Sequence, residues 1–169
     1  MNISLHLFAR LGILLLLLLS SVARADSKDQ TERAEAAFRN GDLITAMGLL
    51  RQAADAGYAP AQARLADLLD AAEQDVEAVA LYRKAAAQGD PAGELGLGRM
   101  LAQGDGVARD IEQGLALIRR AAEKNHPPAI DALARATRTG AFGLTRDPIE
   151  ADRLEQRIKT LREAAKDKR

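Results

Sequence analysis

An internal repeat restricts the fold of this 169-residue chain more than any other feature. The segments GYAPAQARLADLL, GDPAGELGLGRML and NHPPAIDALARAT begin at residues 57, 89 and 125 and align without gaps. Self-similarity at periods of roughly 20 to 50 residues is the signature of repeat architectures, in which each unit buries its apolar face against its neighbours. We therefore expect stacked copies of one small unit.

Each unit is predicted to be a pair of helices. In the first segment, two neighbouring columns of the alignment hold a leucine and then a small residue: Leu65 and Ala66, Leu97 and Gly98, Leu133 and Ala134. A second recurring segment begins with aspartate and covers 42–54, 75–86, 110–122 and, more loosely, 147–159. Its apolar positions are three and four residues apart, which is typical of one face of a helix. With 47% apolar but only 3% aromatic residues, the core should consist of alanine and leucine.

The stretch LGRMLAQGDGVARD, residues 97–110, holds three glycines and two aspartates and could be taken for a ligand loop. A mechanical interpretation explains it better. Gly98 lets a neighbouring helix approach, and Gly104 suits the left-handed conformation that ends a helix. Asp110 is expected to cap the next helix, with Gln113 completing a capping box. Because a calcium loop needs several oxygen ligands at alternating positions, we interpret the stretch as a joint.

The same segments resemble the Sel1-like repeats, which are relatives of the tetratricopeptide repeats. The resemblance rests on a pattern of glycine, leucine, alanine and aspartate: Gly89, Leu97, Gly98, Gly104, Gly106, Val107, Asp110, Leu117, Ala121 and Ala122. The unit from residue 57 lacks about four loop residues, and the loop TGAFGLTRD has one residue more than the pattern. The resemblance implies an all-α solenoid of stacked antiparallel helix pairs, with about three and a half to four repeats.

The first 25 residues are interpreted as a cleavable signal peptide. They contain no acidic residue, carry Arg10 before an apolar block over 11–19, and end in Ala-Arg-Ala. An uncleaved anchor is the alternative, although nine apolar residues fall short of the roughly 20 that a spanning helix needs. We therefore expect a helical-repeat domain over 26–162, a charged tail over 163–169 and a periplasmic or secreted protein with no stable membrane insertion.

Composition argues against several classes of function. Without the signal peptide, 22 basic residues face 24 acidic ones, and a nearly neutral chain is a poor nucleic-acid binder. The chain has no cysteine, and its two histidines are His6, inside the signal peptide, and His126. No histidine pair or thiolate site can therefore form in the mature chain, and we expect neither a metal nor another cofactor.

The resemblance implies that the concave face, lined by the first helix of each pair, holds a protein or peptide. If the leucine column faces the core, the residues two positions further on face this surface. These residues are Asp67, Arg99 and Arg135, and one turn further along Gln103 and Arg138 come close to the same surface, which makes all five candidate binding residues. They are either ordinary solvated charges or a groove, basic in its C-terminal half, that suits an acidic or C-terminal segment. On the second interpretation the protein is an exported adaptor in the assembly or regulation of an envelope complex.

The alternative is a small enzyme or small-molecule binder on the same fold. Some cysteine-rich secreted relatives have been linked to β-lactam binding or hydrolysis, but this chain lacks their cysteines and has no S-x-x-K motif. Its acidic pairs, such as Asp67 and Asp70 or Glu150 and Asp152, are expected at exposed or capping positions. We therefore expect no catalytic residue.

Overall fold

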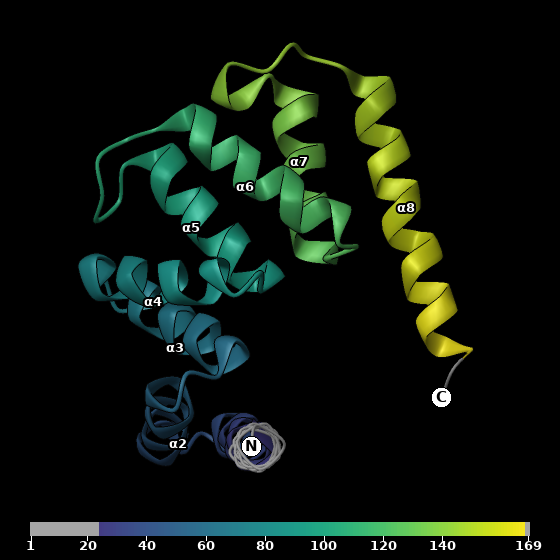
Figure 1. Ribbon diagram of the computed structural model, residues 1–169. Coiled ribbons are helices and arrows are strands. Elements are labelled where there is room, and N and C mark those ends of the chain that lie inside the picture. Colours follow the sequence, from purple (N-terminus) through teal and green to yellow (C-terminus); the bar gives the residue numbers. More distant parts are fainter. Residues whose placement is uncertain (1–23, 168–169) are drawn as a thin grey trace, which may run out of the picture. The chain divides into compact units, whose positions relative to one another are not determined.

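The computed structural model describes residues 24–167, which are helical apart from short connections and contain no strand. Residues 24–39 form the first described helix. The elements that follow are α2 (Leu43–Asp55), α3 (Ala59–Ala71), α4 (Asp75–Ala87), α5 (Pro91–Gln103), α6 (Ile111–Glu123), α7 (Pro127–Thr139), the 3-10 turn η1 (Ala141–Gly143) and α8 (Pro148–Lys166). The all-α expectation is confirmed (Figure 1). Most of the expected signal peptide, residues 1–23, lies outside the described residues.

The chain divides into two compact units, one ending at Ala61 and the other beginning at Gln62. In the first unit, small residues and one leucine form the buried positions of α2: Ala46, Leu50, Ala53 and Ala54. The spacing of these residues places them on one helix face, as the repeat pattern predicts. Every candidate binding residue lies in the second unit.

In the second unit, helices that follow one another in the sequence pack against one another, from α4 on α5 through α7 on α8. The aligned columns provide the contacts. Leu65 and Leu97 are buried, and Leu133 is partly buried against a cluster formed by α6, α7 and α8. The expectation of stacked helix pairs is thereby confirmed. Helix α8 continues through Lys166, so the charged tail begins inside this helix, and its side chains from residue 162 are exposed.

The joint between α5 and α6 is confirmed in its main features. Gly104 ends α5 with a φ of 90°, and the Asp110 side chain accepts a hydrogen bond of 2.9 Å from the amide of Gln113. The reciprocal half of the expected capping box is not formed, because the amide of Asp110 donates instead to the carbonyl of Leu101 at 2.8 Å. This backbone bond fastens the end of the loop to α5. It also occupies the N–H of Asp110, from which the Gln113 side chain would accept a hydrogen bond in a capping box.

The other second helices begin in two ways. Asp42 and Asp147 cap α2 and α8 by accepting hydrogen bonds of 3.0 Å from the amides three residues further on. Asp75 differs, because it is the first residue of α4 and Gln74 occupies the cap position without a side-chain hydrogen bond. Counted back from the aligned small residues Ala46, Ala78 and Gly114, Gln74 and not Asp75 stands at the position that Asp42 and Asp110 occupy.

Candidate functional site

The five candidate residues lie in the second unit, on its first helices α3, α5 and α7. Four of them line one hollow of about 330 Å³: Arg99, Gln103, Arg135 and Arg138. We call this hollow the arginine pocket. The fifth, Asp67, lines a second hollow together with Asp70, His126 and Arg99, which we call the aspartate pocket. Arg99 lines both, so the two pockets adjoin.

The floor of the arginine pocket is apolar. Ile118 of α6 and Ala132 and Ala136 of α7 line it, and Phe142 of η1 forms part of its wall. A pocket with an apolar lining and a few charged groups suits a ligand that carries both an apolar part and an anionic group.

The three arginines of this pocket are not equivalent. Arg135 is 74% exposed and, within residues 24–167, forms an ion pair only with Asp131, one turn earlier on α7. Arg99 is 51% exposed and lies 3.8 Å from a carboxylate oxygen of Asp70 on α3. Such exposed pairs stabilise a protein little, so both guanidinium groups can exchange their carboxylates for those of a ligand.

Arg138 is bound more firmly, because one of its terminal nitrogens donates to Asp152 at 2.8 Å and to Glu155 at 2.7 Å, both on α8. These hydrogen bonds raise the pKa of Arg138 above its ordinary value. Arg138 therefore connects α7 to α8, and Arg99 and Arg135 are the arginines best placed for a partner.

Tyr82 of α4 contacts Asp67, which lines the aspartate pocket. The Tyr82 hydroxyl donates a hydrogen bond of 2.7 Å to Asp67, and its side chain is fully buried. Its ring packs so closely on Gly96 that a Cβ there would overlap a ring atom. Burial raises the pKa of Asp67, although the Tyr82 hydrogen bond and nearby arginines oppose the rise. Tyr82 thus fixes the position of the carboxylate in the pocket.

His126 occupies the cap position of α7 without making a side-chain capping bond. Its side chain lines the aspartate pocket. Burial lowers the pKa of His126, and the charges of Asp90 and Asp67 act in the opposite direction. The imidazole is therefore mostly neutral at pH 7 and adds little positive charge to this part of the surface.

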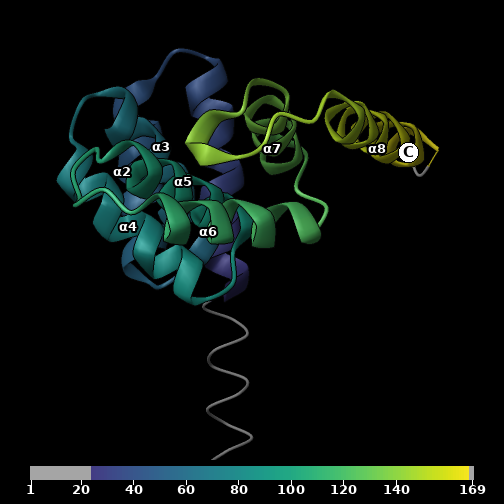
Figure 2. The same cartoon turned by 90° about the horizontal axis from the view of Figure 1, so that it is seen from above.

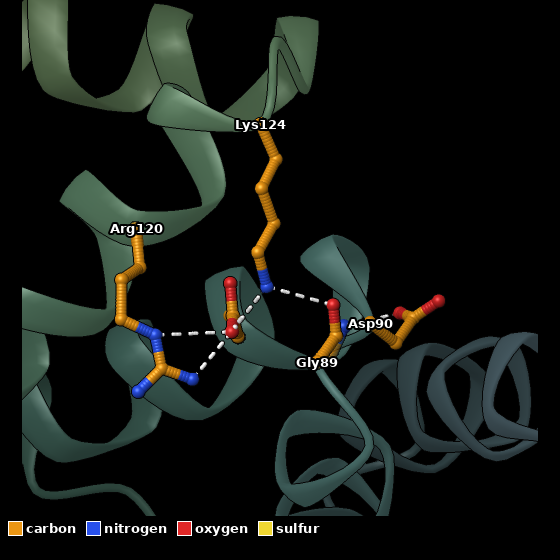
Figure 3. Close-up of polar contacts among 6 residues, drawn as sticks. Gly89, Asp90, Arg120 and Lys124 are labelled. Carbon is orange, nitrogen blue, oxygen red and sulfur yellow. Dashed lines mark hydrogen bonds and ion pairs between the residues drawn. The ribbon is translucent and has the colours of Figure 1, made fainter.

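Glu94 of α5, which the sequence pattern does not single out, is the only charged side chain among the described residues that is fully buried. Its Oε1 accepts hydrogen bonds from Arg120 and, at 2.7 Å, from Lys124 (Figure 3). Lys124 also donates to the carbonyl of Gly89 at 2.8 Å. Burial would raise the pKa of Glu94, but the two cations outweigh it and hold this pKa below its ordinary value. The cluster joins α5 to the end of α6.

Two further observations concern the part of the chain that the structure describes. Its acidic residues and histidine do not gather into groups of three or more that could hold a metal ion. None of its helices has the length and apolar character needed to cross a membrane.

The comparison with protein families identifies the fold. The Sel1 repeat model matches residues 37–58, 59–90 and 91–126, which together make up more than half of the chain. The chain belongs to the Sel1 repeat family. The first match is only part of a unit, and the looser fourth pair, α7 with α8, lies beyond the matched residues, although these helices pack as a pair.

Three solved structures have similar folds. A Sel1 repeat protein from Oxalobacter formigenes is 24% identical, with a TM-score of 0.68 over 80% of this chain and 59% of the other. A protective antigen of uropathogenic Escherichia coli with an SLR fold is 30% identical, with a TM-score of 0.65 over 86% of this chain and 33% of the other. A Sel1 repeat protein from Klebsiella pneumoniae subsp. pneumoniae is 26% identical, with a TM-score of 0.70 over 82% and 70%.

The chain spans 59% and 33% of the first two of these structures. No curated protein matches the sequence. Sel1 repeats generally build scaffolds for protein interaction, typically without enzymatic activity, and this chain has that scaffold.

Proposed function

We propose that this Sel1 repeat protein is an exported adaptor that binds a segment of another protein along the first helices of its second unit. One observation carries the proposal. Arg99 and Arg135, which occupy equivalent positions of successive repeats, line a single pocket with an apolar floor, together with Gln103 and Arg138 one turn further on. Solvated charges that merely keep a helix soluble have no reason to converge on one hollow.

The charges of this surface indicate the kind of partner. Arg99 and Arg135 are exposed, and solvent also reaches the carboxylates of Asp70 and Asp131 with which they form ion pairs. Guanidinium groups bind carboxylates through paired hydrogen bonds, which favours an acidic segment or a C-terminus as the occupant. An adaptor of this kind would act in the assembly or regulation of an envelope complex.

A charge-reversal experiment tests the proposal. Replacing Arg99 and Arg135 with glutamate should weaken binding of the partner by about 2 kcal/mol or more, because the new carboxylates repel an acidic segment. Helicity and melting temperature should change little, since the exposed pairs that are lost contribute little to folding. The partner should be recovered from the compartment into which the protein is exported. Its affinity should be measured at several salt concentrations and should fall as the salt concentration rises.

The matched control is a pair of reversals on the second helices, Arg83→Glu and Arg119→Glu. Both residues are exposed, and they line hollows that contain none of the five candidate residues. An equal loss from the two pairs, or no loss from either, would exclude the arginine pocket as the binding site.

Export is proposed on the order of positive charge, apolar block and Ala-Arg-Ala at the start of the sequence. The intact mass of the protein recovered from the periplasm or medium should correspond to a chain that begins at Asp26. A full-length product embedded in the membrane would contradict cleavage. This result is independent of the binding experiment.

A further inference from the structure

Phe142 is held in a backbone conformation that is unfavourable for its residue type. It lies in η1 with a φ of 57°, inside the left-handed region. For a residue other than glycine, asparagine or aspartate this conformation is uncommon, and it persists only where the surrounding structure enforces it. Its neighbours Gly140 and Gly143 also have positive φ values, of 77° and 75°. The sequence thus places an aromatic residue where a third glycine would avoid the strain.

The loop around Phe142 is fixed by hydrogen bonds to α7. The amide of Gly140 donates to Ala136 at 2.9 Å, and the amide of Asp147 donates to Thr137 at 3.0 Å. The Arg146 side chain adds a third bond, of 3.1 Å, to the carbonyl of Arg138. Figure 2 shows this connection, in yellow-green, running from the end of α7 to α8. The loop has one residue more than the repeat pattern, and these bonds hold the longer loop in a defined shape.

Packing of the core does not account for Phe142. The side chain is only partly buried and does not belong to the buried core, which α7 and α8 complete through other residues, including Ile130, Leu154 and Ile158. Instead Phe142 lines the arginine pocket beside Arg135 and Arg138. The Phe142 side chain therefore lies at the pocket and not in the core, on a backbone conformation that phenylalanine seldom adopts.

We propose that Phe142 determines specificity by forming the wall against which one apolar side chain of the partner packs. The occupant is a peptide segment in which an apolar residue adjoins acidic residues, so that the apolar side chain enters the pocket while carboxylates meet Arg99 and Arg135. This inference rests on the proposed function and adds the apolar requirement. Charge complementarity selects the acidic residues, and the floor of Ile118, Ala132 and Ala136 selects the apolar one.

Selection from a library of random dodecapeptides tests the inference, with the purified protein as bait. The protein should enrich peptides in which an aliphatic or aromatic residue adjoins aspartate or glutamate. Phe142→Gly should bind the best enriched peptide at least about tenfold more weakly and lose the apolar preference, while it keeps the acidic preference. Phe142→Tyr retains the ring and should keep both preferences.

The variants separate the two proposals. Arg99→Glu with Arg135→Glu should abolish the acidic preference, which tests the proposed function. If acidic peptides are enriched and depend on these arginines but Phe142→Gly retains the apolar preference and the affinity, the role of Phe142 is wrong while the groove stands. If no peptide with adjoining apolar and acidic residues is enriched, the proposed occupant is wrong.

Discussion

Removal of both cations that face Glu94, in an Arg120→Ala/Lys124→Ala variant, is expected to lower the free energy of unfolding by about 3 kcal/mol. The Glu94 side chain is fully buried, and its Oε2 accepts no hydrogen bond from the described residues. Without Arg120 and Lys124 a buried carboxylate would keep no charged partner, which is among the most destabilising changes in a protein interior. Urea unfolding at pH 7 measures the effect.

The pH dependence should change sign. In the wild type, the pKa of Glu94 lies below its reference value of 4.5, so its stabilisation is present above that pH and is lost as pH falls through the folded-state pKa. In the variant, burial without a cation should raise this pKa, so protonation should restore part of the lost stability as pH falls toward 5. A deficit that stays constant between pH 7 and pH 5 would mean that Glu94 is not the source of the loss.

The preceding repeat supplies a matched control. Gln62 and Gln88 occupy the positions equivalent to Glu94 and Lys124, and the Gln88 side chain donates to Gln62 at 2.9 Å. Glu94→Gln with Lys124→Gln copies this neutral pair into the next repeat. Because the pair leaves no buried charge, this variant should lose clearly less stability than the variant that lacks both cations.

Gly98→Leu is expected to destabilise the second unit by about 3 kcal/mol, at the upper end of the effect of overpacking. A Cβ on Gly98 would come within 2.8 Å of the Gly114 carbonyl oxygen, and a Cβ on Gly114 would come within 2.6 Å of the Gly98 carbonyl oxygen. The two glycines therefore let the backbones of α5 and α6 meet. Since backbone cannot move aside as a side chain can, the helices must separate. Thermal unfolding followed by circular dichroism measures the loss.

Gly48 offers the opposite case. It is an exposed residue of α2 with nothing within 4 Å of a Cβ placed on it. Gly48→Ala should be neutral or stabilise its helix by up to about 1 kcal/mol, because alanine favours helix more than glycine does. Gly98→Ala should destabilise where Gly48→Ala does not. If both alanine variants melt like the wild type, Gly98 is not required for the close approach of α5 and α6.

The sequence predicted the repeat architecture because the residues that build it recur at equivalent positions. The columns that contain Leu97 and Gly98 identified the buried face and the helix crossing, and both are confirmed. Caps were predictable for the same reason, since Asp110 and Asp147 begin their segments. Asp75 also begins a segment but does not cap, because it is already the first residue of α4 and Gln74 occupies the cap position.

Features that occur in one repeat only could not be found this way. Glu94 has Gln62 and Ile130 at the equivalent positions, so no recurring pattern marked it as a buried charge. Phe142 lies in a loop that departs from the pattern, and its role depends on a pocket that only the packed helices form. Arg138 was expected at the binding surface, and it does line the pocket, but its bonds to α8 depend on tertiary packing. Helical geometry alone predicted that Arg99 and Arg135 face the same surface, and both line one hollow.

The central claim is that a partner binds over the first helices of the second unit, and site-specific photo-crosslinking in intact cells tests it most directly. Gln103 lines the arginine pocket, whereas Gln113 is another exposed glutamine and lines a hollow on the second-helix side. A photoreactive amino acid at position 103 should yield a discrete crosslink to one partner protein, and the same amino acid at position 113 should yield none. Crosslinks of equal strength from both positions, or from position 113 alone, would contradict the account.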